Sequence, residues 1–471
     1  MKRAVRVALA VTTGALLLAP CGAAAAAPSS WSPPGQSQPR VLGADVIAEV
    51  QPLGYFVTAV AVHYDRDVHL RGGEVPAEAF EVSASVQGST SARTVTRAYL
   101  NDEPERAGRG DRSGDWVIVE LSTEDANASA STYDGQLTHV LPLEGAYSID
   151  QVADVRDERG RVVVPEGPAV VNDGVLSPDD AGFARGSYTG TSGQTLAYGL
   201  FSPQRDGRGG GRGPWADGRE RGRPSGAGRV PLVVALHGAG ERGTDGTVNL
   251  IANELAVSFT RPERQARNPS IVLAPQAPPP SVTPVPAGSS VWEVPSVQSA
   301  LMELIERTVR ENPVDPDRIY ITGLSMGSMG TWDILPRHPD LFAAALPVTG
   351  YADLDSAPVV ADIPIWATHS IDDASVLFDR ADSDWHMMDA IEATGTPVVR
   401  DEWAGNLPDA ENEARARAQW RRAQAVGSHT LFTAFTEGTT PVNPHFSWVP
   451  TYSNGVMLDW LFAQSKRSSG R

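Results

Sequence analysis

The chain has 471 residues, 41% of them hydrophobic, so it is long enough for two or three domains and apolar enough for a sizeable core. Its 39 basic and 57 acidic residues give a formal net charge of −18, which disfavours nucleic acid and anionic membranes as partners. The one cysteine is Cys21, and the two lysines are Lys2 and Lys466. This composition argues against disulfides, a thiolate metal site, a cysteine nucleophile and a catalytic lysine.

Residues 1–27 have the pattern of a secretory signal peptide. The cations of MKRAVR lead into the apolar run VALAVTTGALLLAP, and the small-residue run CGAAAAAP follows. The apolar run is shorter than the roughly 20 residues that a membrane-spanning helix needs. A lipoprotein site at Cys21 is disfavoured because Pro20 stands where a small residue is expected. We therefore expect a secreted, extracellular bacterial protein with no membrane attachment once the leader is removed.

Residues 40–175 predict an all-β sandwich. Short, β-branched and often alternating segments follow one another: ADVIAEV, FVTAVAVHY, AFEVSAS, RTVTRAYL, DWVIVELS, LTHVLPL, YSIDQVADV and RVVVPEG. Gly, Pro, Asp and Asn lie between them at the spacing of sandwich turns. His63 and His69 flank acidic residues here, but positions at strand edges explain them better than a metal site, and we expect no metal.

From about residue 186 the pattern changes to that of an α/β domain, which we expect to extend to residue 466. TLAYGLFSP, RVPLVVALHG, SIVLAPQ, RIYITGLS, FAAALPVTG, IPIWATHS and TLFTAFTEG are short apolar runs, as expected of strands buried on both faces. Residues 294–312 and 454–464 predict amphipathic helices. Strands that alternate with helices indicate a doubly wound, mostly parallel sheet.

Residues 204–229 interrupt this domain with QRDGRGGGRGPWADGRERGRPSGAGR. Gly, Arg and Pro dominate, and little in the segment could pack into a core. An arginine-rich run can bind nucleic acid, but this one has a single aromatic residue and sits in an acidic protein. We therefore predict a flexible surface insertion.

The stretch ITGLSMGSMGTW contains the pattern of a nucleophile elbow, which needs glycine two residues before and two residues after the serine. Ser325 has Gly323 and Gly327 at these positions, whereas Ser328 would need glycine where Met326 stands. An apolar strand precedes the pattern and a helix can follow it. Ser325 is therefore the predicted nucleophile.

A serine hydroxyl needs a base, and the base needs an acid that orients it. In this fold the chain order is serine, acid, histidine, each after a strand. Asp372 and Asp373 both follow IPIWATHS and are both candidates for the acid. His445 follows TLFTAFTEG in a loop before the final helix and is the predicted base. The other histidines after Ser325 stand in less suitable positions and are interpreted as surface residues.

An acyl-transfer site also needs N–H donors for the oxyanion of the tetrahedral intermediate. The backbone N–H of Met326, directly after the nucleophile, is one expected donor. The loop in VVALHGAGERG offers the other, and we favour Ala239 with Gly240 as the second choice. His237 is interpreted as a support for this loop with no part in proton transfer.

Several motifs together resemble those of a known group. LVVALHGAGERG, IVLAPQAP, DPDRIYITGLSMGSMGTW, HPDLFAAALPVTG, IPIWATHSIDD and HFSWVPTY are similar to segments of the secreted α/β-hydrolases known as predicted peptidases and polyhydroxybutyrate-depolymerase-like esterases. The resemblance covers residues 186–466. Some members carry an N-terminal immunoglobulin-like domain, which the resemblance implies for residues 40–175. It also implies a Ser-His-Asp triad that works without a metal or an organic cofactor.

Carried over to this chain, the family nucleophile falls on Ser325 and its histidine on His445. The acid of the family's H-G-x-x-D turn falls on Asp373, because His369 stands at the matching spacing before it. Asp372 remains the alternative.

The chain departs from the family pattern by Ser328 after Gly327 and by Ser370 after the turn histidine, and neither change removes a triad member. Trp292, Trp332 and Trp448 lie near family motifs and are candidates to line a substrate pocket, although core packing explains each of them equally well.

The sequence thus predicts a secreted serine carboxylesterase that acts on small-molecule or polymeric esters through an acyl-enzyme. Three alternatives stay open: a serine peptidase, an extracellular polyester depolymerase whose sandwich adheres to the polymer, and a binding protein with an inactive hydrolase domain. The sandwich could also mediate homo-oligomer formation.

Overall fold

The structure is a computed structural model that describes residues 38–203, 228–286 and 288–466. The account that follows concerns these residues. The predicted signal peptide (1–27) and most of the predicted insertion (204–229) lie outside them.

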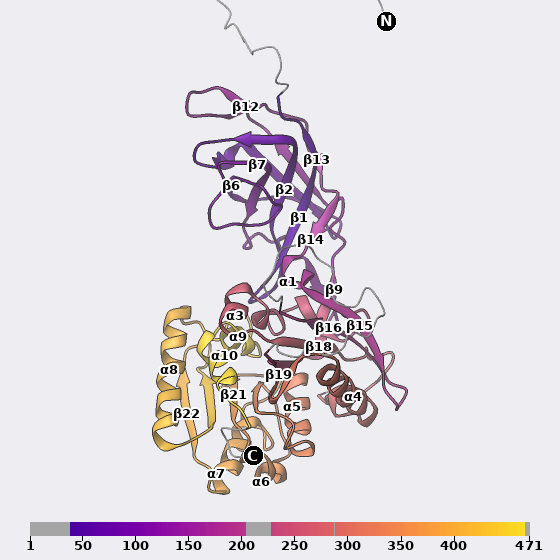
Figure 1. Cartoon of the computed structure of the whole chain (residues 1–471), viewed down its shortest axis with the longest axis vertical. Helices are drawn as coiled ribbons and strands as arrows, with labels where there is room; N and C mark the ends of the chain where they lie inside the picture. The colour runs from indigo at the N-terminus through magenta and orange to yellow at the C-terminus, as the bar shows by residue number, and fades with distance from the viewer. Residues whose placement is uncertain (1–37, 204–227, 287, 467–471) are drawn as a thin grey trace, which may run out of the picture. The chain divides into compact units, whose positions relative to one another are not determined.

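The first domain is the expected β-sandwich (Figure 1). Its two main sheets are built from β1 (Val41–Gln51), β2 (Gly54–His69), β3 (Glu74–Val75), β4 (Phe80–Val86), β5 (Ser89–Arg93), β6 (Val95–Asn101), β7 (Ser113–Leu121), β10 (Tyr147–Gln151), β13 (Val170–Val171) and β14 (Gly174–Leu176). One sheet has the order β14-β1-β2-β7-β6-β3, and the other has the order β13-β10-β4-β5. Two smaller ribbons pair β8 (Ser131–Tyr133) with β9 (Thr138–Val140) and β11 (Val155–Arg156) with β12 (Val162–Val164).

The alternation of side chains along β2 builds two separate apolar layers. Val60 and Val62 belong to the main core of the sandwich. Ala59 and Ala61 point to the other face of the same sheet, where they pack with a small cluster that includes Tyr99. The central strand of the larger sheet is therefore buried on both faces, which explains its nearly continuous apolar sequence.

The second domain is built on one nine-stranded sheet, as expected for the α/β-hydrolase fold. Its order is β15-β16-β18-β17-β19-β20-β21-β23-β22. The strands are β15 (Phe183–Thr189), β16 (Thr195–Phe201), β17 (Val230–Leu236), β18 (Ile271–Gln276), β19 (Val314–Leu324), β20 (Ala344–Val348), β21 (Ile365–Ser370), β22 (Val398–Trp403) and β23 (Thr430–Phe435). β15, β16 and β18 pair antiparallel, and the pairs from β18 to β22 are parallel.

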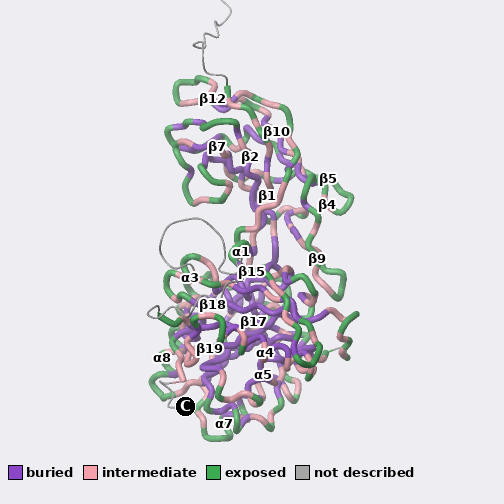
Figure 2. The backbone as a smooth tube through the Cα atoms, turned by 45° about the vertical axis from the view of Figure 1, so that its right-hand side comes forward, coloured by how far each residue is buried: buried purple, intermediate pink, exposed green. Residues whose placement is uncertain are grey.

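Helices cover both faces of this sheet (Figure 1). The longer ones are α4 (Pro295–Glu311), α5 (Met326–Arg337), α7 (Asp384–Ala393), α8 (Asp409–Val426) and α10 (Gly455–Phe462). Apolar side chains of α4, α5 and α7 join one core cluster, whereas those of α8 and α10 join another. The central strands between them are buried over most of their length, as Figure 2 shows around β17 and β19.

Two features of this domain differ from the sequence analysis. The segment 454–464 was expected to be amphipathic, but α10 is buried almost all round, because it packs between the sheet and α8. In addition, β15 and β22 were not predicted from the sequence. Both strands lie at the edges of the sheet. Most side chains of β15 are exposed or half-buried, and most side chains of β22 are half-buried, so neither strand has the continuous apolar run of a central strand.

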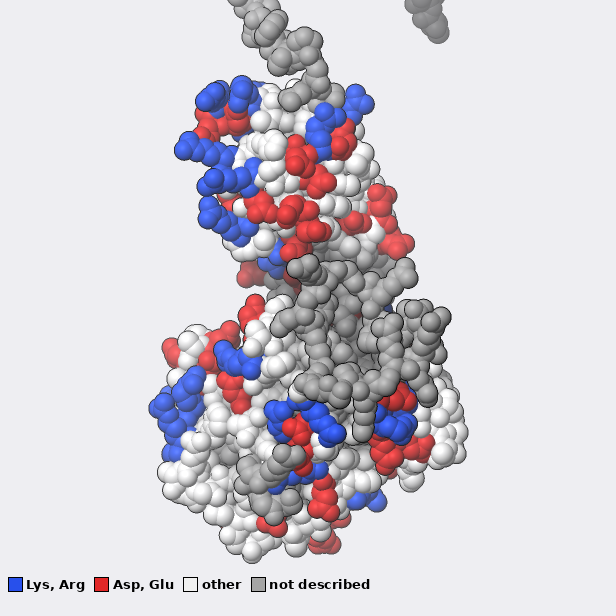
Figure 3. All heavy atoms as spheres, in the orientation of Figure 1, with Lys and Arg blue, Asp and Glu red and all other residues white. Residues whose placement is uncertain are grey.

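Acidic and basic side chains lie intermixed over the face of the molecule in Figure 3. The net negative charge is therefore not gathered into one acidic surface on that face. Within the described residues, no helix combines the length and the apolar character needed to cross a membrane.

Arg93 provides a test of the sandwich core. Its side chain is fully buried, pairs with Asp125 at 3.0 Å and donates to the Tyr147 hydroxyl and to two backbone carbonyls. Arg93→Met would leave these acceptors without their donor, and we expect a loss of about 3–5 kcal/mol in the free energy of unfolding. Arg71→Met is the matched control, because Arg71 pairs with Glu158 on the surface; it should cost less than about 1 kcal/mol. Equal thermal denaturation midpoints for both variants would contradict the prediction.

Candidate active site

Ser325 stands at the sharp turn between β19 and α5. Its backbone has a φ of +51° and a ψ of −118°, a region that L-residues rarely adopt. The turn needs both flanking glycines: a Cβ on Gly323 would collide with the Gly327 carbonyl, and a Cβ on Gly327 would collide with the Leu236 carbonyl. The Ser325 N–H donates to the Val348 carbonyl at 2.9 Å, which holds the turn against β20.

The structure brings Ser325, His445 and Asp373 together in one hydrogen-bonded row. His445 Nε2 lies 2.9 Å from Ser325 Oγ, and His445 Nδ1 lies 2.7 Å from Asp373 Oδ2. The three side chains follow the carboxyl ends of β19, β21 and β23, which lie close together in the parallel sheet. Asp372, the alternative acid, instead accepts the N–H of Gly438.

The surroundings of Asp373 keep its carboxyl group ionised and able to accept hydrogen bonds. Its side chain is fully buried, and its Oδ1 accepts the N–H groups of Ser375 and Val376 at 2.8 and 3.0 Å. Burial alone would raise the pKa of Asp373, but hydrogen bonds from His369 and His445 outweigh it and hold this pKa well below its usual range. Asp373 therefore remains a carboxylate that can fix the tautomer of His445.

A cluster of hydroxyl groups anchors the loop that carries His445. Ser370 Oγ lies 2.5 Å from Thr440 Oγ1 and 2.9 Å from Ser447 Oγ, so the end of β21 is tied to both ends of that loop. All three side chains are buried. Ser370, which departs from the family pattern, thus has a structural role that the sequence analysis did not foresee.

The predicted oxyanion loop follows β17 and lies against the elbow. Ala239 and Gly240 begin a short 3-10 turn (Ala239–Glu241), and a Cβ on Gly238 would lie 2.8 Å from the Leu324 side chain. Met326 is the first residue of α5, so its N–H is one of the unpaired donors at the helix start. The loop and the helix start are thus neighbours, as two oxyanion donors must be.

Buried polar groups support this loop from below. His237 is buried, its Nε2 accepts the Ala277 N–H at 2.9 Å, and burial lowers its pKa to about 4. A neutral His237 agrees with the predicted supporting role. Glu241 is also buried, and burial raises its pKa to about 7. Glu241 was not predicted from the sequence, since one acidic residue in a glycine-rich loop carries no recognisable pattern.

The expectation that Trp292 and Trp332 line a substrate pocket is wrong. Their side chains are 0% and 1% exposed, because they belong to the core between α4, α5 and the sheet. The Trp292 indole donates to the His237 carbonyl at 3.1 Å, so it braces the oxyanion loop. Trp448 is 9% exposed, and its ring packs edge-on against His445 with centroids 5.3 Å apart.

The remaining candidates lie away from the serine. Ser328 is fully buried within α5, behind the elbow. His386 is in α7 next to Asp389, and His429 contacts the Ala361 carbonyl before β23. Within residues 38–203, 228–286 and 288–466, no three His, Cys, Asp or Glu side chains converge in a way that could hold a metal ion.

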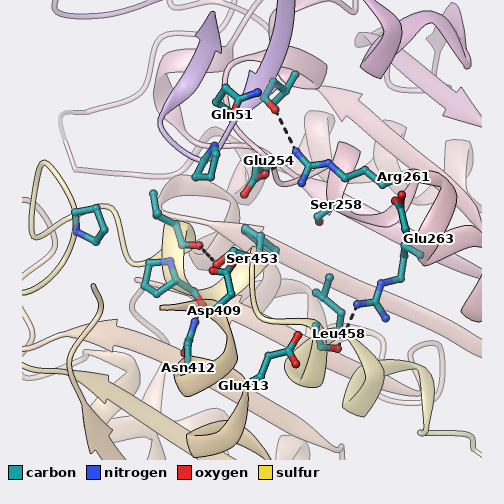
Figure 4. Close-up of a pocket in the computed structure, with 18 of the residues that line it drawn as sticks. Gln51, Glu254, Ser258, Arg261, Glu263, Asp409, Asn412, Glu413, Ser453 and Leu458 are labelled. Carbon is teal, nitrogen blue, oxygen red and sulfur yellow. Dashed lines mark hydrogen bonds and ion pairs between the residues drawn. The ribbon is translucent and has the colours of Figure 1, made fainter. Parts of the chain in front are cut away.

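A hollow of about 720 Å³ lies elsewhere in the structure (Figure 4). It is lined by Gln51, the last residue of β1, and by residues of the hydrolase domain that include Glu254 and Arg261. These last two side chains pair with each other at 2.6 Å. The lining does not include Ser325 or His445, so this hollow is separate from the hydrogen-bonded row.

Two family comparisons agree with this architecture. Residues 43–164 match the family described as "Esterase Ig-like N-terminal domain", and residues 297–400 match the "Prolyl oligopeptidase family". The predicted resemblance to α/β-hydrolases with an immunoglobulin-like front domain is therefore confirmed.

Two individual proteins extend the comparison. A solved structure described as a thermostable esterase is 28% identical, with a TM-score of 0.68, and the match covers 90% of this chain and 100% of that chain. "Poly(3-hydroxyalkanoate) depolymerase C" of Paucimonas lemoignei is 28% identical over 124 residues, which are 26% of this chain and 28% of the relative. The chain thus resembles an esterase over most of its length and the depolymerase over only a small part.

The elbow can be tested through Gly327. Gly327→Ala would place a methyl group against the backbone carbonyls of Leu236 and His237, which cannot move aside as a flexible side chain could. We expect the free energy of unfolding to fall by about 3 kcal/mol. Gly72→Ala is the control, because a Cβ there meets nothing within 4 Å. Denaturant unfolding followed by tryptophan fluorescence would measure both, and an unchanged Gly327→Ala midpoint would count against the elbow geometry.

Proposed function

We propose that the protein is a serine carboxylesterase in which Ser325, His445 and Asp373 form the catalytic triad. The observation that carries this proposal is the continuous row from Ser325 Oγ through His445 to Asp373, with distances of 2.9 and 2.7 Å. These are the distances that a nucleophile, its base and the orienting acid require. The similarity to an esterase over 90% of the chain supports the same reading.

In the proposed reaction, Ser325 Oγ attacks the ester carbonyl while its proton passes to His445 Nε2. The negative charge moves to the carbonyl oxygen, to which the N–H groups of Met326 and Ala239 donate hydrogen bonds, and the positive end of α5 stabilises it further. The C–O bond then breaks, and His445 returns the proton to the leaving alcohol. Water attacks the acyl-enzyme by the same route, releases the acid and restores the Ser325 hydroxyl.

A polyester depolymerase is the second candidate function. It is favoured by the match to the poly(3-hydroxyalkanoate) depolymerase, which covers 28% of that relative. The chemistry at Ser325 would be the same, since each repeat of such a polymer is joined by a carboxylic ester. We further propose that the protein is secreted, because residues 1–27 have the pattern of a signal peptide.

The proposed function is tested with p-nitrophenyl esters from acetate to palmitate, on the wild-type protein, Ser325→Ala and Ser328→Ala. Ser325→Ala should lower kcat/KM by at least about 10³-fold, because the acyl-enzyme can no longer form. Ser328→Ala, which changes a serine three residues away that is buried in α5, should retain most of the turnover. A parallel assay on a poly(3-hydroxyalkanoate) film would test the second candidate.

Turnover that survives in Ser325→Ala but disappears in Ser328→Ala would reverse the assignment of the nucleophile. A folded wild-type protein without activity on any ester would refute the esterase proposal and direct attention to peptide substrates.

A further inference from the structure

A second histidine lies directly behind the proposed triad. His369, the next-to-last residue of β21, is completely buried. Its Nδ1 lies 2.6 Å from Oδ1 of Asp384, and its Nε2 lies 2.9 Å from the Val376 carbonyl. The same Nε2 lies 3.3 Å from Asp373 Oδ2, the oxygen that also contacts His445. The row of polar contacts thus continues beyond Asp373, through an ion pair to His369 and a hydrogen bond from His369 to Asp384.

The partners of His369 define its protonation. A carbonyl oxygen and a carboxylate oxygen only accept hydrogen bonds, so a ring nitrogen that faces either of them must carry a proton. Nε2 faces the Val376 carbonyl and Nδ1 faces the Asp384 carboxylate. Both nitrogens are therefore donors, and the ring is an imidazolium cation.

The groups around the ring support the cation. Asp384, at the start of α7, and Asp373, in the turn after β21, are the charged side chains that contact it, and Phe378 packs edge-on against it with centroids 5.5 Å apart. Burial would lower the pKa of His369, but the two carboxylates outweigh it and raise this pKa to about 10. Asp384 is fixed in turn, since its Oδ2 accepts the Gly350 N–H at 3.0 Å.

We propose that His369 is a positioning residue of the triad: as an imidazolium held between Asp384 and Asp373, it shares the Asp373 carboxylate with His445. This inference rests on the proposed function, because it concerns the base of that triad. The sharing has two consequences. It keeps Asp373 ionised in a fully buried site, and it reduces the attraction that Asp373 can exert on a protonated His445.

The second consequence bears on the proton transfers. A lone buried carboxylate would hold His445 strongly in its protonated form, and a protonated ring cannot accept the Ser325 proton. The positive charge of His369 offsets part of that attraction. Asp373, His369 and Asp384 together carry a net charge of −1, and this charge is balanced by the protonated His445 during catalysis.

The protonation state can be measured on the wild-type protein without any assay of activity. In a ¹⁵N-histidine-labelled sample, the ring of His369 should show both nitrogens protonated at pH 8.5, where an ordinary histidine is neutral. Loss of that signal in the His369→Gln variant would assign the signal to the His369 ring. If Asp384 held the proton instead, Nδ1 would be unprotonated. A wild-type spectrum with no doubly protonated ring at pH 8.5 would overturn the proposal, whether or not the protein turns over an ester.

The positioning role is tested with the double variant His369→Gln/Asp384→Asn, which removes one positive and one negative charge and so keeps the net charge. His369 lies nearer to Asp373 than Asp384 does, so the loss of its positive charge dominates. Asp373 then attracts a protonated His445 more strongly, and the acid limb of the pH profile of kcat/KM should move to higher pH by about half a unit to one unit. His386→Gln/Asp389→Asn is the matched control, since this pair lies half-exposed on α7 with 3.5 Å between nitrogen and oxygen. Its profile should coincide with that of the wild type.

An acid limb that stays in place in the double variant, even with a lower melting temperature or lower kcat, would show that His369 only supports the fold and would overturn the proposal. A shift to lower pH would overturn it as well. If the double variant does not fold, the wild-type ¹⁵N spectrum alone decides whether His369 is the imidazolium that the proposal requires. Failure of the esterase proposal is recognised separately, by a wild-type protein that keeps the doubly protonated ring but hydrolyses no ester.

Discussion

The close approach of the Leu236 carbonyl to the start of α5 is the constraint on which the rest of the site depends. It leaves no room for a side chain at Gly327 and forces Ser325 into a backbone conformation with positive φ. That conformation turns the Ser325 hydroxyl toward His445, and it places the N–H of Met326 beside the loop that follows Leu236. A single close approach between the end of β17 and the start of α5 therefore aligns the nucleophile with the expected oxyanion donors.

This constraint explains how much of the site could be predicted from the sequence. The need for glycine on both sides of Ser325 is local, so the five residues from Gly323 to Gly327 are enough to recognise the turn in the sequence. The buried parallel strands are visible as continuous apolar runs, and their order fixes which loops meet at one edge of the sheet. His445 could be chosen because it follows a strand at that edge. The choice of Asp373 over Asp372 needed the family resemblance, since both residues follow β21.

The features that could not be predicted depend on contacts between distant segments. Trp292 and Trp332 stand in motifs near the site, but whether an indole faces a pocket or the core depends on the packing of α4 and α5. His369 and Asp384 are 15 residues apart and contact each other only because α7 begins beside the end of β21. No spacing rule records such a contact. The same holds for Ser370, whose partners lie 70 and 77 residues further along the chain.

The front domain lies beside the oxyanion loop. A Cβ on Gly240 would lie 3.3 Å from Thr138 Oγ1 and 3.4 Å from a ring carbon of Tyr133, both from the β8–β9 ribbon of the sandwich. Tyr133 is also 61% exposed. The surroundings of the proposed oxyanion site are therefore built by both domains. For this reason the hydrolase motifs, which specify the chemistry at Ser325, do not by themselves specify the ester.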